Sequence, residues 1–310
     1  MSDLIGILVD DILPIFIVIG LGFVFGLRFK PDVQVLSRLT FYVFGPCLVF
    51  SSLVRSGLAG DELVRIAAFT LSVALIMGLL GWLAARLLRL DARATAGLVL
   101  VCMFVNGGNY GLGVNQRAFG EEGLARAVIF FVTSTLLVYT LGVSIAVAGG
   151  DGGAAGWRRA LRRVFQVPPV YAVIGALLVR AFAIDVTQPA LEPLMAGVEI
   201  VGRAAIPVML TILGVQLAQT PMMQHVRSAL AASGLRLVGG PLIAWVTAAA
   251  LGLTGVARQA AIVEASMPAA VINIILATEY RAAPALVTGT VVISTLLSPI
   301  TLTLIISLVK

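Results

Sequence analysis

Hydrophobic residues fall into ten long runs separated by short polar segments. Each run approaches 20 residues, which is enough to cross a hydrocarbon core of about 30 Å as an α-helix. The pattern therefore predicts an all-α membrane protein with ten transmembrane helices. The predicted spans are 5–27, 35–54, 63–86, 94–116, 124–148, 167–184, 190–218, 227–252, 256–278 and 284–308.

The second half of the chain repeats the first. Pro14–Gly20 returns as Pro169–Gly175 at an offset of 155 residues, and Val132–Leu137 returns as Val292–Leu297 at an offset of 160. Each half holds five spans, and because five is odd the second half must lie upside down in the membrane. Inverted repeats with interrupted helices at matching places are typical of secondary transporters.

Composition supports a membrane domain without a soluble module. Apolar residues make up 60% of the 310 positions and charged residues 12%, and the mean hydropathy is +1.07. Soluble domains are about half apolar and about a quarter charged. The predicted organisation is a first repeat over 1–148, a cytoplasmic linker over 149–166 and a second repeat over 167–310.

Basic residues predict the orientation in the membrane. They are more numerous in the loops after odd-numbered spans than in the loops after even-numbered ones, so the odd loops are expected inside. We therefore expect both termini outside the plasma (inner) membrane and the linker against inner-leaflet lipid. Within the linker, Trp157–Phe165 is interpreted as a basic interfacial helix, with a lipid-regulated switch as the alternative. The net charge of +6 then follows from orientation, and no nucleic-acid partner is expected.

The fourth span contains a poor helix-forming segment, Asn106–Gly113. Each interior glycine costs about 1 kcal/mol relative to alanine, and backbone unwound in a membrane must line a cavity or be buried in protein. Close helix packing through small residues is the alternative, but two amides in the segment favour a substrate site. The candidate substrate-binding residues here are Asn106, Gly107, Gly108, Asn109, Tyr110 and Gly111.

The ninth span carries the counterpart of this break. Pro268 removes a backbone donor inside the span, and Asn273 follows it. Two antiparallel spans broken at matching depth would cross, and their half-helix N-termini would offer partial positive charge to a carboxylate. Met267, Pro268 and Asn273 are the candidate substrate-binding residues of this span.

These motifs resemble those of the auxin efflux carrier family. Asn-x-Gly-Asn-x-Gly-Leu begins at Asn106, Met-Pro-Ala-x-x-x-Asn begins at Met267, and Ala-x-Glu-Tyr begins at Ala277. That family includes plant auxin exporters and bacterial permeases for malate or malonate, and its fold is similar to that of bile acid:sodium symporters. The chain departs from the pattern at Gly113, where many members have proline.

The resemblance implies an architecture and an assembly. Spans 1, 2, 6 and 7 would form a scaffold that is often dimeric, so a homodimer is expected. Spans 3–5 and 8–10 would form a moving domain with the crossing helices at its centre. Pro46 and Pro207 occupy matching places in the two halves and are interpreted as kinks in scaffold helices; span-to-span packing explains them equally well.

Ionisable residues inside spans are candidate functional groups. Glu264 precedes Pro268 by one turn and is a candidate for coupling to H⁺ or Na⁺, although it could lie at the interface. Glu199 and Arg203 are four residues apart and can form an ion pair; a substrate contact by Arg203 is the alternative. Arg236 is expected to snorkel to the inner surface.

The sequence favours a carrier over other classes of membrane protein. The leading hypothesis is a secondary transporter of a small organic anion that works by elevator-type alternating access. A passive channel or a ligand sensor is the alternative. No His-Glu-x-x-His, Gly-x-Ser-x-Gly or phosphate-binding-loop motif is present, which argues against an enzyme or an ATP-driven pump. No cofactor or metal site is expected.

Overall fold

The structure, a computed structural model, describes residues 2–150, 167–220 and 226–310. The secondary structure over these ranges consists of helices and one isolated β-bridge. In chain order the elements are α1 (Ser2–Gly6), η1 (Ile7–Ile12), α2 (Leu13–Phe29), α3 (Val33–Leu39), η2 (Thr40–Phe44), α4 (Gly45–Arg55), α5 (Gly60–Leu87), α6 (Ala92–Met103), η3 (Gly107–Gly111), α7 (Leu112–Leu137), η4 (Val138–Gly142), α8 (Val143–Gly149), α10 (Pro168–Ala181), α11 (Glu192–Ala218), α12 (Val226–Gly234), η5 (Leu235–Gly239), α13 (Gly240–Ala250), α14 (Gly255–Ala265), α15 (Ile272–Tyr280) and α16 (Pro284–Val309).

Seven helical segments in the described ranges are long and apolar enough to cross a membrane. They are Leu4–Phe29, Val33–Arg55, Gly60–Leu87, Gly107–Gly149, Glu192–Ala218, Val226–Ala250 and Pro284–Val309. The prediction of an all-α membrane protein is confirmed. Most of the predicted linker, including Trp157–Phe165, lies outside the described residues.

The remaining predicted spans coincide with shorter helices. The fourth and ninth spans are interrupted, as α6 followed by η3 and as α14 followed by α15, and the sixth is α10. The fifth span continues from the second half of the fourth within one 43-residue helix. Gly120 separates the two inside that helix, with φ 66° and ψ −159°. A residue with a side chain rarely adopts such a conformation, so glycine allows the chain to turn here.

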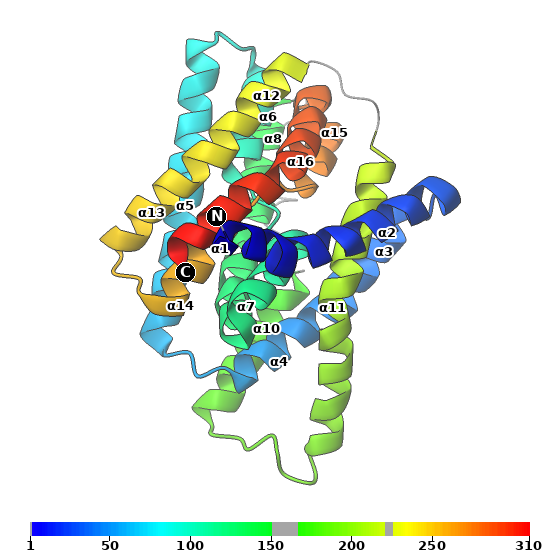
Figure 1. Cartoon of the computed structure of the whole chain (residues 1–310), viewed down its shortest axis with the longest axis vertical. Coiled ribbons are helices and arrows are strands. Elements are labelled where there is room, and N and C mark those ends of the chain that lie inside the picture. Colours follow the sequence, from blue (N-terminus) through cyan, green and yellow to red (C-terminus); the bar gives the residue numbers. More distant parts are fainter. Residues whose placement is uncertain (1, 151–166, 221–225) are drawn as a thin grey trace.

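The helices pack as two groups. In the first, α11 packs along α2 and against α4, and α10 packs on α4; we call α1–α4, α10 and α11 the α11 group. In the second, α5 packs on α6 and α7, α14 packs on α7 and α13, and α12 packs on α16; we call α5–α8 and α12–α16 the α14 group. Figure 1 shows α2, α3 and α11 together on one side of the molecule and α5, α12 and α13 on the other.

The two prolines of matching position lie in the α11 group. Pro46 falls in the first turn of α4, directly after the π-helical segment η2, and Pro207 lies inside α11. Both sit within continuous helical spans. A proline has no N–H to donate to the carbonyl four residues before it, so it removes a backbone hydrogen bond from a helix interior. The carbonyl of Pro207 itself accepts a hydrogen bond from the hydroxyl of Thr211 at 2.8 Å.

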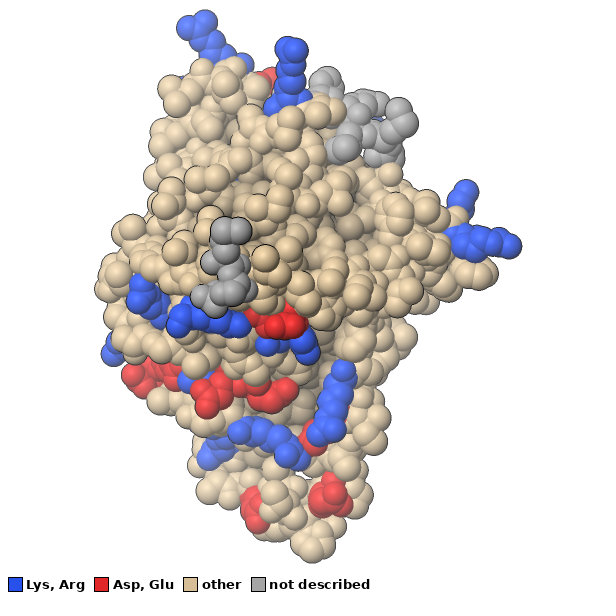
Figure 2. Space-filling view, in the orientation of Figure 1, with Lys and Arg blue, Asp and Glu red and all other residues tan. Residues whose placement is uncertain are grey.

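Charged residues gather in distinct zones of the surface. On the face drawn in Figure 2, basic residues project at the top and right, and a band of mixed charge crosses the lower half. A broad zone without charged side chains lies between them on this face. Many large apolar side chains are exposed along the helices, including Leu21, Leu79 and Ile300. This distribution suits a protein surrounded by lipid.

Candidate functional site

The two interrupted helices meet at their breaks. Val105 and Ala269 form an antiparallel bridge. The backbone N–H of Asn106 donates to the carbonyl of Pro268 at 2.8 Å, and that of Ala270 donates to the carbonyl of Phe104 at 3.0 Å. Backbone groups freed by the two breaks therefore satisfy each other, which is the condition for unwound backbone inside a membrane.

Asn273 strengthens this junction. Its side-chain Nδ2 donates to the carbonyl of Phe104 at 3.0 Å, so one carbonyl oxygen accepts from a backbone and a side-chain donor. The side chain is fully buried, and its Oδ1 has no hydrogen-bond partner among the described residues. Asn273 can thus hold the breaks together and still offer an acceptor.

Glu264 lies in a cradle formed by the first break. The residue is fully buried, and its Oε1 accepts from Asn115 Nδ2 at 3.1 Å. A Cβ atom at Gly107 would lie 2.6 Å from Oε2, and one at Gly111 would lie 2.5 Å from the same oxygen. The glycines therefore leave the space that the carboxyl group occupies. Glu264 is therefore enclosed by protein, and its position across the membrane stays a prediction.

Asn115 is the residue of this cradle that the sequence did not single out. It donates both to Glu264 and to the carbonyl of Gly111, the latter at 3.0 Å, and it is fully buried. The available signal was its position four residues after Gly111, on the same helix face. A third amide close to two others at a break was the pattern to notice.

The amides of the first break lie where its second half-helix begins. Asn106 is non-helical and directly precedes η3; it is buried, and its Nδ2 has no partner among the described residues. Asn109 is half-buried. Because the first N–H groups of a helix lack intrahelical acceptors, these amides stand beside further unused donors.

Family comparison identifies the class of protein that carries this site. The profile of the family described as membrane transport protein matches residues 7–154 and 157–306. The chain belongs to that family. It is also 30% identical over 302 residues to an uncharacterised transporter of Methanothermobacter thermautotrophicus, covering 95% of this chain and 96% of that protein. The protein is therefore a membrane transporter and not an enzyme.

The resemblance to auxin efflux carriers is confirmed at the level of family. Auxin efflux carrier component 1 of Arabidopsis thaliana is 28% identical over 149 residues, which are 47% of this chain and 23% of the plant protein. A third relative, an uncharacterised transporter of Methanocaldococcus jannaschii, is 23% identical over 296 residues, covering 93% of this chain and 94% of that protein.

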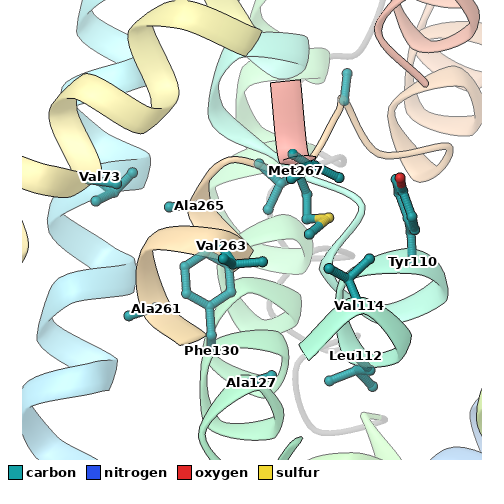
Figure 3. Packing of buried hydrophobic residues seen from close by; sticks show 14 of the residues in the cluster. Val73, Tyr110, Leu112, Val114, Ala127, Phe130, Ala261, Val263, Ala265 and Met267 are labelled. Carbon is teal, nitrogen blue, oxygen red and sulfur yellow. The ribbon is translucent and has the colours of Figure 1, made fainter. Parts of the chain in front are cut away.

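Two other predicted site residues of this transporter are packed in its hydrophobic core. Figure 3 shows Tyr110 and Met267 among the buried apolar side chains of the core. Tyr110 Oη lies 3.2 Å from the hydroxyl of Ser298 on α16. Its ring also meets that of Phe16 on α2 edge-on, with centroids 5.8 Å apart. Tyr110 thus joins the break to both groups of helices.

Arg236 does not extend to the membrane surface. It is fully buried and donates to the backbone carbonyls of Cys102 and Ala265. The expectation that it snorkels is therefore wrong, because two backbone acceptors compensate its guanidinium inside the protein.

The predicted ion pair on α11 is present, with an additional partner. Arg203 Nη2 lies 3.7 Å from Glu199 Oε2, and Arg55 of α4 also pairs with Glu199. Both arginine side chains are exposed, at 83% for Arg203 and 62% for Arg55. The pair lies within the α11 group.

Proposed function

We propose that this transporter is a secondary carrier of a small organic anion and works by elevator-type alternating access. The observation that carries the proposal is the junction of the two breaks. Unwound backbone in a membrane is costly unless it lines a cavity or is buried in protein, and helices broken at matching places form the binding sites of secondary transporters. Here it is paired and accompanied by amides with unused polar atoms.

The proposed site recognises a carboxylate. Asn106, Asn109 and Asn273 offer amide groups beside the half-helix starts at Gly107 and Ile272. Helix N-termini attract anions through unpaired N–H groups and partial positive charge. A carboxylate such as malate, malonate or an auxin-like acid fits this chemistry, and the family includes proteins named for auxin efflux.

The proposed movement divides the molecule between its two groups of helices. The α11 group would be the scaffold, and the α14 group with the breaks would move across the membrane. Two observations support inverted repeats: the sequence repeat, and the equivalent placement of the breaks in the fourth and ninth spans. The proposed carrier is a homodimer in the plasma membrane with both termini outside. In this proposal Glu264 couples transport to H⁺ or Na⁺.

Transport in proteoliposomes tests the function. Purified protein should take up a radiolabelled carboxylate from a panel of mono- and dicarboxylates, with saturable rates and counterflow from unlabelled substrate inside. Asn109→Ala should abolish this uptake, whereas Gln34→Ala, an exposed control position in α3, should leave it unchanged.

The alternatives give different results in the same assay. Flux that does not saturate and shows no counterflow would indicate a channel. Binding without flux would indicate a sensor. Absence of both across the panel would contradict an organic-anion carrier.

A further inference from the structure

Arg236 joins the ends of two half-helices. Its Nη1 donates to the carbonyl of Cys102 at 2.7 Å, and its Nη2 donates to the carbonyl of Ala265. Cys102 lies in the last turn of α6, and Ala265 is the last residue of α14. One buried side chain therefore binds the C-terminal ends of the first halves of both interrupted helices.

The place that the guanidinium occupies attracts cations. The last carbonyls of a helix have no intrahelical donors, and each helix C-terminus carries a partial negative charge of about half a unit. Two such ends converge here. In carriers built on interrupted helices, C-terminal half-helix ends and unwound carbonyls are the groups that coordinate Na⁺.

The surrounding chain is shaped around this side chain. Arg236 lies in the π-helical segment η5, and such segments are frequent at functional sites. Gly240 follows one turn later, and a Cβ atom there would lie 2.8 Å from Cζ of Arg236 and 3.0 Å from the carbonyl oxygen of Ala265. Glycine at this position therefore leaves room for the guanidinium and for its acceptor.

We propose that Arg236 is a built-in cation that replaces a coupling sodium ion at the paired ends of α6 and α14, so that transport requires no Na⁺. The inference rests on the proposed carrier function and narrows the coupling proposed for Glu264 from H⁺ or Na⁺ to H⁺. The guanidinium is covalently attached and planar, and it donates to two carbonyls in a set geometry. It therefore neutralises the paired ends in every step of a transport cycle, which an exchanging ion does not.

The first experiment measures sodium dependence in the unaltered protein. Carboxylate uptake into proteoliposomes is compared in Na⁺ and in N-methylglucamine at equal ionic strength. A ligand that is coupled to a second site changes the affinity there by about 5- to 150-fold. If Na⁺ is not coupled to transport, the uptake rates in the two salts should differ by less than this, within about threefold. A larger fall without Na⁺ would overturn the inference while leaving the carrier function intact.

The second experiment does not depend on flux. Arg236→Ala leaves the carbonyls of Cys102 and Ala265 without the donor that binds them. The melting temperature of this variant should be several degrees below that of the control Arg227→Ala, which alters an exposed arginine of α12. Millimolar methylguanidinium or Na⁺ should raise the melting temperature of Arg236→Ala and leave that of the unaltered protein unchanged.

These variants also separate the inference from the proposed function. Where uptake is measurable, Arg236→Ala should lose it, methylguanidinium should restore part of it, and Arg236→Lys should keep less than the unaltered protein because an ammonium group cannot bridge two carbonyls as a guanidinium does. Where no carboxylate is transported at all, the function fails and the melting temperatures decide the inference. An Arg236→Ala variant as stable as Arg227→Ala and indifferent to both cations would overturn it.

Discussion

Single residues at the first break determine how much space and which hydrogen-bond donors surround the carboxyl group of Glu264. The carboxyl group is buried, has one side-chain donor in Asn115 and lies over two glycines. Burying a polar group is costly unless it is hydrogen-bonded. The cradle residues therefore determine whether the carboxyl group can stay in place.

Gly111→Ala should disturb the site by crowding. The added Cβ would lie 2.5 and 2.6 Å from the two carboxyl oxygens of Glu264, and overpacking of this kind costs about 1–3 kcal/mol. We expect the loss of most substrate uptake together with a lower melting temperature. Gly20→Ala, where nothing lies within 4 Å of the added atom, should retain uptake. Equal behaviour of the two variants would contradict the packing argument.

Asn115 and Glu264 should be coupled energetically. Asn115→Ala leaves a buried carboxyl group without its described donor, which costs about 1–3 kcal/mol. In a Glu264→Ala background the same change should cost clearly less. A double-mutant cycle from denaturant or thermal unfolding in detergent measures this difference. Additive effects would show that the 3.1 Å hydrogen bond contributes no net stability.

At the scale of helices, the asparagines of the two breaks differ in how the fold holds them. Asn273 is tied to the opposite break through Phe104, whereas Asn109 is half-buried and makes no side-chain hydrogen bond with the described residues. Both were predicted to bind substrate, and the structure gives them different surroundings.

Alanine at these two positions should therefore have different consequences. Asn109→Ala should abolish transport with an unchanged melting temperature. Asn273→Ala should abolish transport and also lower stability by about 0.5–1.5 kcal/mol, the usual net value of a hydrogen bond. Uptake in proteoliposomes and thermal unfolding of the same preparations measure both effects. Near-normal uptake in both variants would show that the substrate site lies elsewhere.

For the whole molecule, charged residues connect the two groups of helices near the chain termini. Lys310 Nζ lies 2.6 Å from Asp11 Oδ2, and Arg117 Nη2 donates to the carbonyl of Asp10 at 2.6 Å. Figure 1 shows both marked termini close together at this place. If the α14 group moves against the α11 group, these contacts must break during each cycle.

Asp11→Asn should consequently shift the balance of conformations. The variant removes the ionic part of a partly buried contact between the groups, so states that lack this contact become more populated. Spin labels at Leu194 of α11 and Leu242 of α13, both exposed, should give a broader or shifted distance distribution. Asp61→Asn is the control, since Asp61 pairs with Arg65 within one group at 3.7 Å. Identical distributions in all three proteins would contradict a role for this contact.

Local properties of the sequence were sufficient to predict an all-α membrane protein and the two interrupted helices. Hydrophobicity over about 20 residues reports on a membrane helix, and glycine runs or an internal proline interrupt a helix wherever it lies. The segments Asn106–Gly113 and Met267–Asn273 were therefore identified before their contact was known. Motifs within them also led to the correct family.

Only the tertiary structure decided which distant groups compensate each other. Arg236 looked like a surface cation because its two acceptors, Cys102 and Ala265, lie 134 and 29 residues away along the chain. Asn115 was overlooked because its partner Glu264 is 149 residues away. Helix-forming tendency and hydrophobicity are local properties of the sequence. The hydrogen bonds of a buried polar group instead depend on which distant residues the fold places next to it. The sequence by itself determined where the helices break, and the packing of the helices determined what fills and neutralises those breaks.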